Sequence, residues 1–347
     1  MNGLMTQDSL LSIELDLVQE ILIKQTKSGD LKFDLVVENW LSQRGKMLRP
    51  AFYLLSSRFG LPEAQLSHWQ NLARENSQTL KVELLNNEKQ MRFYRGAAAI
   101  ELIHMATLIH DDVIDEAKLR RGRPSIQTTH GKDYAVYMGD YFFCKAILMV
   151  ADHEQQEDLK SLGHAMTQIC LGEIRQYHSR HIFQPDLRNY FKIIASKTAA
   201  LFSLSFYAGA IENGCGKKAA SDLGKVGYNM GMAFQIIDDL LDYKPVEEIG
   251  KETYKDLTQG NINLPIHLAL KSYKSEDLIH ILSGDTLDYE AFKQIVLLIK
   301  EVKADEESEK YANKFTKRSL KYLNRLPEHS TKALLTDYIL ELLSRKL

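Results

Sequence analysis

Apolar residues recur every three or four positions along most of the chain, and this spacing predicts helices rather than strands. The first clear helix, over residues 8–26, is amphipathic. Three further segments are apolar on most sides, and this pattern predicts that they form buried helices, over 97–115, 186–211 and 220–243. Helices over 132–151 and 165–180 are expected to be mainly core, and amphipathic helices with charged faces follow residue 267. The pattern therefore predicts an all-α fold.

Two polar stretches interrupt this pattern. Residues 71–95 are unusually polar and are expected to form an insertion, either a helix with a long loop or a partly mobile segment. Residues 244–264 are expected to form a mobile loop that covers a neighbouring site, because the stretch is long and contains glycine. Length and composition allow one large helical domain or two smaller ones, and residues 1–347 are expected to form a single helical domain.

Three aspartates end the helix predicted over 97–115. Asp111 and Asp115 are one helical turn apart, so their carboxylates lie on one face, and Asp112 lies between them. Two like charges near a helix C-terminus are unfavourable unless a cation compensates them. Mg²⁺ takes one or two carboxylates and completes its coordination with water and phosphate oxygens. The alternative is ordinary surface charge, but the apolar residues around the motif favour a pocket.

The same motif recurs at the end of the helix predicted over 220–243, as Asp238, Asp239 and Asp242. Gln235 lies one turn before it and adds a neutral dipole. If the two helices are neighbours in a bundle, their carboxylates face each other across a cavity and hold Mg²⁺ between them. Two copies of the motif favour this interpretation more strongly than one.

Several cationic side chains are candidates for binding an anion near the aspartate motifs. Arg120 and Arg121 follow the first motif, and their guanidinium groups suit phosphate. Lys46 and Arg49 stand at a predicted helix start near Pro50, where backbone amides also attract anions. Lys197, inside an apolar run, is expected to pair with an anion or to extend to solvent. His104, two turns before Asp111, is either a core residue or part of the same pocket.

Composition narrows the range of functions. The chain is 44% hydrophobic and 26% charged with a net charge of −2, so no overall field attracts nucleic acid. Three widely spaced cysteines suit a reducing compartment. No signal peptide and no long apolar span is recognised. These features predict a cytoplasmic protein without stable membrane insertion and with at most transient membrane contact.

Five motifs in order, GKMLRP, ELIHMATLIHDDVIDEAKLRRGRP, SKTA, MAFQIIDDLLDY and GKETYKDLTQGNINLP, resemble the trans-isoprenyl diphosphate synthases, or polyprenyl synthetases. The resemblance covers roughly residues 42–265. It implies a helical bundle around a deep central cavity, usually a homodimer. The implied reaction is the Mg²⁺-dependent condensation of isopentenyl diphosphate with an allylic diphosphate.

The resemblance also implies roles for individual residues. Metal ligands are expected among Asp111, Asp112, Asp115, Asp238, Asp239 and Asp242. The allylic diphosphate is expected to contact Arg120, Lys197 and Lys251. Isopentenyl diphosphate is expected to contact Lys46, Arg49, His104 and Arg121. Thr198 and Gln235 match positions whose dipoles face the cationic centre, and both are counted as catalytic with Asp111, Asp115, Lys197 and Asp238.

The residues before Asp111 indicate product length. Ala106, with Thr107 beside it and Ile103 one turn deeper, leaves space where a large aromatic residue would stop the growing chain. A medium- or long-chain product is therefore expected. A short-chain synthase, the catalytic subunit of a heteromer and, less favoured, a terpene cyclase are the alternatives. The chain departs from the family pattern at Met47, where a basic residue is usual, and at Asn261, where a lysine is usual.

Overall fold

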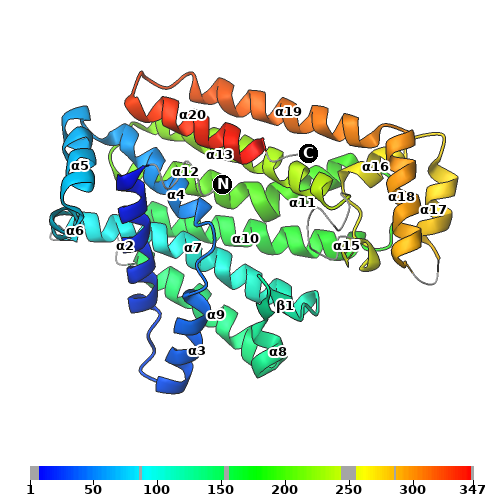
Figure 1. Cartoon of the computed structure of the whole chain (residues 1–347), viewed down its shortest axis with the longest axis horizontal. Coiled ribbons are helices and arrows are strands. Elements are labelled where there is room, and N and C mark those ends of the chain that lie inside the picture. The colour runs from blue at the N-terminus through cyan, green and yellow to red at the C-terminus, as the bar shows by residue number, and fades with distance from the viewer. Residues whose placement is uncertain (1–7, 86–87, 152–155, 244–254, 285–286, 345–347) are drawn as a thin grey trace. The chain divides into compact units, whose positions relative to one another are not determined.

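The computed structural model describes residues 8–85, 88–151, 156–243, 255–284 and 287–344, and these are almost entirely helical (Figure 1). The chain divides into two compact units. Unit 1 comprises Met1–Met166, Leu201–Gly224 and Leu326–Leu335, and unit 2 comprises Thr167–Ala200, Lys225–Arg325 and Thr336–Leu347. The all-α prediction is confirmed, whereas the single catalytic domain stays a prediction.

The elements follow one another along the chain. The first half contains α2 (Ser9–Gln25), α3 (Leu31–Leu41), α4 (Leu48–Ser57), η1 (Arg58–Gly60), α5 (Glu63–Glu75), α6 (Ser77–Leu85), α7 (Glu88–Ile114), β1 (Leu119–Arg120), β2 (Arg123–Pro124), α8 (Ile126–His130) and α9 (Lys132–Ala151). The second half contains α10 (Gln156–Ser179), α11 (Leu187–Ile194), η2 (Ala195–Ala199), α12 (Ala200–Glu212), α13 (Lys217–Leu241), α15 (Lys255–Thr258), α16 (Leu264–Ala269), α17 (Ser275–Leu282), α18 (Tyr289–Glu301), α19 (Ala304–Leu323) and α20 (Ser330–Leu343).

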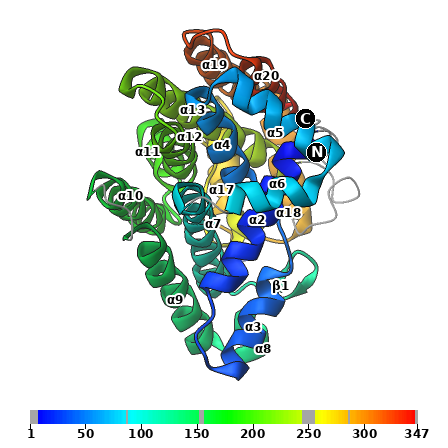
Figure 2. The same cartoon turned by 90° about the vertical axis from the view of Figure 1, so that its left-hand side faces the viewer.

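Helix α7 is the central helix of unit 1 and packs against α2, α4 and α9 (Figure 2). Ala97, Ala98 and Ala99 are fully buried, and their small side chains allow neighbouring helices to approach closely. The helix begins at Glu88, nine residues before the start that the apolar pattern predicted. The polar stretch 71–95 accordingly contributes to α5, α6 and α7, so a long loop there was the wrong alternative for its described residues.

An ionic cluster is buried in unit 1. The Arg58 guanidinium is 1% exposed and lies 2.7 Å from Asp8 Oδ2 and 2.9 Å from Glu14 Oε2. The Tyr94 hydroxyl donates to Glu14 Oε1 at 3.2 Å. Burial raises the pKa of Glu14, while the positive charge of Arg58 lowers it. The cluster joins the start of α2 to η1 through ion pairs and to α7 through the Tyr94 hydroxyl. A buried charge is unfavourable without a partner of opposite charge, so each ion of the pair depends on the other.

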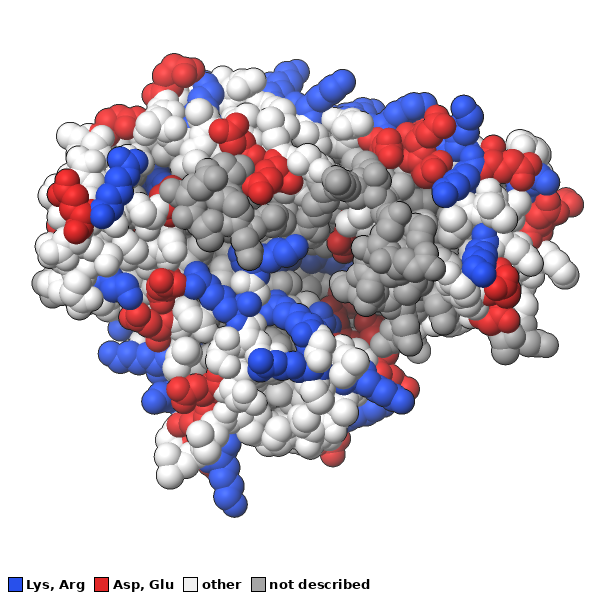
Figure 3. Space-filling model, in the orientation of Figure 1, with Lys and Arg blue, Asp and Glu red and all other residues white. Residues whose placement is uncertain are grey.

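Exposed charges of both signs are interspersed on the face of the molecule that Figure 3 shows. This distribution agrees with the net charge of −2, which gives no strong overall field. Helix α19 illustrates the mixture, because Glu306 and Glu307 in its first turn precede exposed basic side chains at Lys314, Lys317 and Arg318. Any attraction of an anion to this protein must therefore depend on local groups of side chains.

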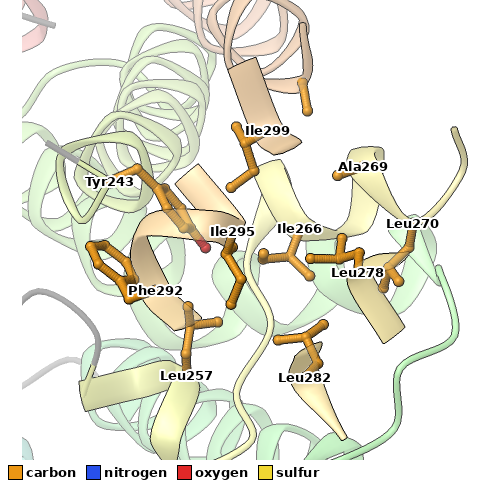
Figure 4. Close-up of a cluster of buried hydrophobic side chains, with 11 residues drawn as sticks. Tyr243, Leu257, Ile266, Ala269, Leu270, Leu278, Leu282, Phe292, Ile295 and Ile299 are labelled. Atoms are coloured by element: carbon orange, nitrogen blue, oxygen red, sulfur yellow. The ribbon is translucent and has the colours of Figure 1, made fainter. Parts of the chain in front are cut away.

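The hydrophobic core of unit 2 lies among α15 to α18 and the end of α13 (Figure 4). Ile266 and Ile295 are fully buried, and the Tyr243 ring stacks on Phe292 with 6.1 Å between centroids. Helix α19 packs on α16 and α18. This core supports the segment 261–267, which contributes Asn261, Ile262, Asn263 and His267 to the cavity described below.

The stretch from Leu187 to Glu212 is helical throughout but not uniformly α-helical. Residues Ala195–Ala199 form a π-helical turn, which contains the Ser-Lys-Thr sequence that interrupts the apolar pattern. Such turns insert one extra residue and often occur at functional sites. The stretch, like Lys132–Ala151, is also long and apolar enough to span a membrane. Length and composition alone are weak evidence that these helices span a membrane, because the buried core helices of other proteins share them.

Candidate active site

The first aspartate motif occupies the last turn of α7. The Asp115 N–H donates to Asp111 O at 2.8 Å, so the helical hydrogen bonding continues and the two residues are one turn apart, as predicted. Both side chains are half-buried, whereas Asp112 is 2% exposed. The helix ends where Glu116 adopts φ 49° and the Gln127 amide donates to Ala117 O at 2.9 Å. Two carboxylates on one face therefore remain at the helix end.

A two-residue hairpin follows the motif and carries both arginines. Strands β1 and β2 pair in antiparallel fashion, and Arg121 and Gly122 both have positive φ, which is the geometry of a type I′ turn. Arg120 Nε lies 2.9 and 3.0 Å from the Asp112 carboxylate oxygens. The Arg121 guanidinium donates to Gln43 O at 2.7 Å. The two cations thus extend to different parts of unit 1.

The predicted isopentenyl diphosphate residues lie in unit 1. Arg49 is partly buried with its guanidinium 4.7 Å from the Phe202 ring, and burial lowers its pKa to about 10. Burial, reinforced by the positive charges of nearby arginines, holds the pKa of His104 well below its usual value. Lys46 is exposed just before α4. A Cβ atom at Gly45 would lie 2.4 Å from the Arg121 guanidinium, so any larger residue there would displace that cation.

The second aspartate motif occupies the end of α13 in unit 2. Asp238 is exposed and Asp242 half-buried, whereas Asp239 is 7% exposed. Asp239 accepts hydrogen bonds from the Tyr190 hydroxyl at 2.6 Å and from Gln235 Nε2 at 3.0 Å. Burial raises the pKa of Asp239 to about 7. The middle residue of each motif is therefore engaged by other side chains, while the metal role of both stays a prediction.

Lys197 pairs with an anion, which confirms the first of the two interpretations of its place in an apolar helix. Its ammonium lies 2.9 Å from Glu173 Oε2 and also donates to Gln176. A Cβ atom at Gly172 would lie 2.8 Å from the Ser196 Cβ, so glycine allows α10 to approach the π-helical turn.

Two further predicted residues join Lys197 in unit 2. The Thr198 hydroxyl donates to Gln235 Oε1 at 2.7 Å, which connects the π-helical turn to α13. Lys197, Thr198 and Gln235 all line one cavity of about 530 Å³ that lies within unit 2. The structure thus brings together three residues that are up to 38 positions apart in the sequence.

The same cavity has walls that the sequence pattern did not identify. Besides Asn261, which already stood out as a departure from the family pattern, they contain Arg175, Gln176, Ser179, Asn189, Tyr190, Asn263 and His267. The end of α10 was expected to be mainly core, and that expectation was wrong for the residues that line this cavity. Polar side chains at 175, 176 and 179 share one helical face, and this spacing was the signal in the sequence.

The aspartates suit a divalent ion by their chemistry. Among the described residues, no three His, Cys, Asp or Glu side chains converge on one point. A site of few carboxylates suits Mg²⁺, which keeps water or phosphate oxygens as its remaining ligands. Asp111 and Asp115 provide such a set in unit 1, and Asp238 and Asp242 do so in unit 2. The approach of the two sets across one cavity remains a prediction.

Other predicted residues have definite positions. Ala106 and Ile103 are fully buried on α7, and the half-buried Thr107 donates its hydroxyl to His104 O at 2.8 Å. Asn261 lines the unit 2 cavity, and its Oδ1 is buried and accepts no hydrogen bond from the part of the chain that the structure describes. Lys251 and most of the predicted 244–264 loop lie outside the described residues.

Comparisons with known proteins show which family the chain belongs to. The polyprenyl synthetase family model matches residues 32–299. The chain is 33% identical over 333 residues to heptaprenyl diphosphate synthase component 2 of Geobacillus stearothermophilus, covering 96% of each chain. It also matches the crystal structure of heptaprenyl diphosphate synthase from Staphylococcus aureus, with a TM-score of 0.82, 29% identity and coverage of 96% and 98%.

A second solved structure is similar over the whole chain. Geranylgeranyl pyrophosphate synthase from Lactobacillus brevis matches with a TM-score of 0.86 and 28% identity, covering 99% of this chain and 100% of the other. The fold is therefore that of the isoprenyl diphosphate synthases, as predicted. The chain belongs to the polyprenyl synthetase family, whose reaction joins isopentenyl diphosphate to an allylic diphosphate, and it is a prenyl-transferring enzyme.

Proposed function

We propose that this protein condenses isopentenyl diphosphate with an allylic diphosphate in the presence of Mg²⁺ and makes a medium- or long-chain all-trans polyprenyl diphosphate. The observation that carries the proposal is the grouping of Lys197, Thr198 and Gln235 around one cavity with both polar and apolar walls, with Gln235 one turn before Asp238 on α13. The similarity to a heptaprenyl synthase component supports the product class.

The reaction begins when the allylic carbon–oxygen bond breaks and its electron pair leaves with the diphosphate. Mg²⁺ held by Asp111 and Asp115, or by Asp238 and Asp242, would neutralise the charge that develops on this group. Arg120 and Lys197 are the cations proposed for oxygens of the allylic diphosphate. Groups that bind the departing diphosphate more strongly than the intact substrate lower the barrier.

The second half of the reaction forms the new carbon–carbon bond. Lys46, Arg49 and Arg121 hold the diphosphate of isopentenyl diphosphate, and the His104 imidazole can donate a hydrogen bond to it. The double bond of this substrate attacks the allylic cation, and a proton is then lost, with the released diphosphate as the nearest base. Oxygen atoms of Thr198 and Gln235 stabilise the cation by their dipoles. Water must be excluded, because it would trap the cation as an alcohol.

An assay with purified protein tests this proposal. The protein is incubated with Mg²⁺, labelled isopentenyl diphosphate and allylic primers of increasing length, and the products are separated by chromatography. Medium- or long-chain products that require all three components support the proposal. Products formed from the allylic diphosphate alone would indicate a terpene cyclase, and products no longer than geranylgeranyl diphosphate would indicate a short-chain synthase.

We propose a homodimer as the active form. Helix α9 carries large apolar side chains in solvent, with Tyr137 72% exposed and Leu148 60% exposed. Such side chains are typical of a surface that a partner covers. Light scattering should give twice the chain mass, and Tyr137→Glu with Leu148→Glu should give the monomer. An inactive chain that gains activity only with a second gene product would instead indicate the catalytic half of a heteromer.

We also propose that the enzyme works in the cytoplasm. Cys144, Cys170 and Cys215 are free thiols, which suits a reducing compartment. Cell fractionation tests this, and recovery of the protein in the membrane fraction after a high-salt wash would contradict it.

A further inference from the structure

A network of hydrogen bonds runs through the wall of the unit 2 cavity. The Tyr190 hydroxyl donates to Asp239 Oδ2 at 2.6 Å, and Gln235 Nε2 donates to Asp239 Oδ1 at 3.0 Å. At its other end, the Thr198 hydroxyl donates to Gln235 Oε1 at 2.7 Å. Three elements contribute these side chains, namely α11, α13 and the π-helical turn. The network therefore joins a buried phenol to the threonine that lines the cavity.

The direction of each hydrogen bond follows from the chemistry of Asp239. An ionised carboxylate only accepts hydrogen bonds, so Gln235 must turn its NH₂ group toward Asp239 and its oxygen away. The Gln235 oxygen can only accept, so Thr198 must donate to it. The Thr198 hydrogen is thereby used, and its oxygen lone pairs remain for the cavity. One carboxylate thus sets the orientation of two dipoles.

Asp239 is placed to orient rather than to bind an ion. It is 7% exposed, and each of its oxygens already accepts a hydrogen bond from a side chain. The Leu264 N–H lies 3.5 Å from Oδ2 as well. Its neighbour Asp238 is exposed, so the two adjacent residues have opposite environments. The difference separates a carboxylate that faces solvent from one that belongs to the protein interior.

We propose that Tyr190 and Asp239 are positioning residues that fix Gln235 and Thr198 with their oxygens toward the allylic cation. The inference rests on the proposed function and adds two residues to it. An inverted Gln235 would direct its NH₂ group to Thr198, whose hydrogen would then point toward the cavity. The dipole facing a developing positive charge would be reversed, which raises the barrier to ionisation without weakening ground-state binding.

The first test is Asp239→Asn, assayed at pH 8. An asparagine can donate to the Gln235 oxygen, so the amide of Gln235 is free to invert. We expect kcat to fall roughly tenfold or more, as for a lost hydrogen bond in a transition state. Both KM values and the Mg²⁺ concentration for half-maximal activity should change less than about twofold. A strongly raised Mg²⁺ requirement with an unchanged saturating rate would show that Asp239 is a metal ligand and would overturn the inference.

The second test exchanges the positions of the carboxylate and the amide group by combining Gln235→Glu and Asp239→Asn in one protein. The introduced glutamate can accept from the introduced asparagine amide with one oxygen and from the Thr198 hydroxyl with the other. The outward oxygen of Thr198 is thereby restored, while the net charge of the protein is kept. We expect kcat to recover to within about threefold of the wild type. A double variant no faster than Asp239→Asn would contradict the proposal.

Two phenols supply a matched control. Tyr190→Phe removes a donor from the network, whereas Tyr243→Phe removes another buried phenol, which donates to Asn263 instead. We expect a lower kcat for Tyr190→Phe only, with both proteins folded by circular dichroism and with unchanged allylic diphosphate affinity by calorimetry. Equal kcat values for the two variants would overturn the role of Tyr190. A wild-type enzyme without activity would refute the proposed function itself, which is a distinct outcome.

Discussion

Arg120 binds Asp112 through both carboxylate oxygens, with Nε 2.9 Å from Oδ1 and 3.0 Å from Oδ2. The Asp112 side chain is 3% exposed, so its carboxylate is largely shielded from water. A bidentate pair of this kind holds the guanidinium in a fixed orientation. Asp112 therefore positions the Arg120 side chain, whereas the role of the half-buried Asp111 and Asp115 as metal ligands stays a prediction.

The two roles predict different effects of substitution. Asp112→Asn should loosen Arg120 and raise KM for the allylic diphosphate about tenfold, with little change in the Mg²⁺ requirement. Asp111→Asn should instead lower kcat by roughly a hundredfold or more, because charge on the leaving group is no longer neutralised. Steady-state kinetics across a Mg²⁺ series measures both. If Asp112→Asn mimics Asp111→Asn, then Asp112 binds the metal.

The buried Arg58 cluster should be needed for stability. Arg58→Met leaves Glu14 and Asp8 without their cation, and removing one partner of a buried pair costs about 3–5 kcal/mol. Urea unfolding followed by circular dichroism should show this loss. The control is Lys81→Met, which breaks the more exposed pair with Glu20 and should cost less than about 1 kcal/mol. Equal losses in the two variants would contradict the prediction.

His267 should make stability depend on pH. It is 7% exposed, and burial is the main reason why its pKa falls from 6.5 to about 4. As the pH is lowered, His267 takes up a proton in the unfolded chain before it does so in the folded protein. The contribution of His267 to the free energy of unfolding is therefore fully present above pH 6.5 and is lost as the pH falls toward 4. His267→Gln should reduce the loss between these pH values by up to about 3 kcal/mol.

Unfolding by urea at about pH 7, 5 and 4 provides the measurement of this effect. His280→Gln, which removes an exposed histidine from α17, should leave the pH dependence as it is in the wild type. An unchanged pH dependence for His267→Gln would show that other groups carry the effect.

Ala106→Phe should shorten the product. Ala106 is fully buried on α7, and a phenyl ring there would occupy the space proposed for the growing chain. Extra volume in a packed core costs about 1–3 kcal/mol, so thermal unfolding should be followed in parallel. Chromatography of the products gives the result. A folded variant with the wild-type product length would refute the role of this position.

Much of the site was predictable because it depends on local geometry. Asp111 and Asp115 lie one turn apart in the sequence pattern and in the structure, since helical periodicity fixes that relation without any other part of the chain. The same holds for Lys46 and Arg49 at the start of α4. The all-α fold followed from the same periodicity.

Partners that are distant along the chain were not predictable. Nothing near Lys197 in sequence indicates Glu173, which meets it only because Gly172 lets α10 approach the π-helical turn. Likewise, the position of Tyr190 beside Asp239 depends on the packing of two helices. Side-chain pairing across helices depends on rotation and separation, which periodicity alone leaves open.

The tight turn at Arg121 and Gly122 couples the positions of Arg120 and Arg121, so that one cannot move without the other. Adjacent Cα atoms are about 3.8 Å apart, and the backbone of a two-residue turn is too short to let one of the two arginines shift independently of the other. A branched side chain in place of Gly122, where φ is 76°, would therefore disturb the contacts with Asp112 and with the Gln43 carbonyl together. Loss of one small residue would thus misplace the cations proposed for both substrates at once.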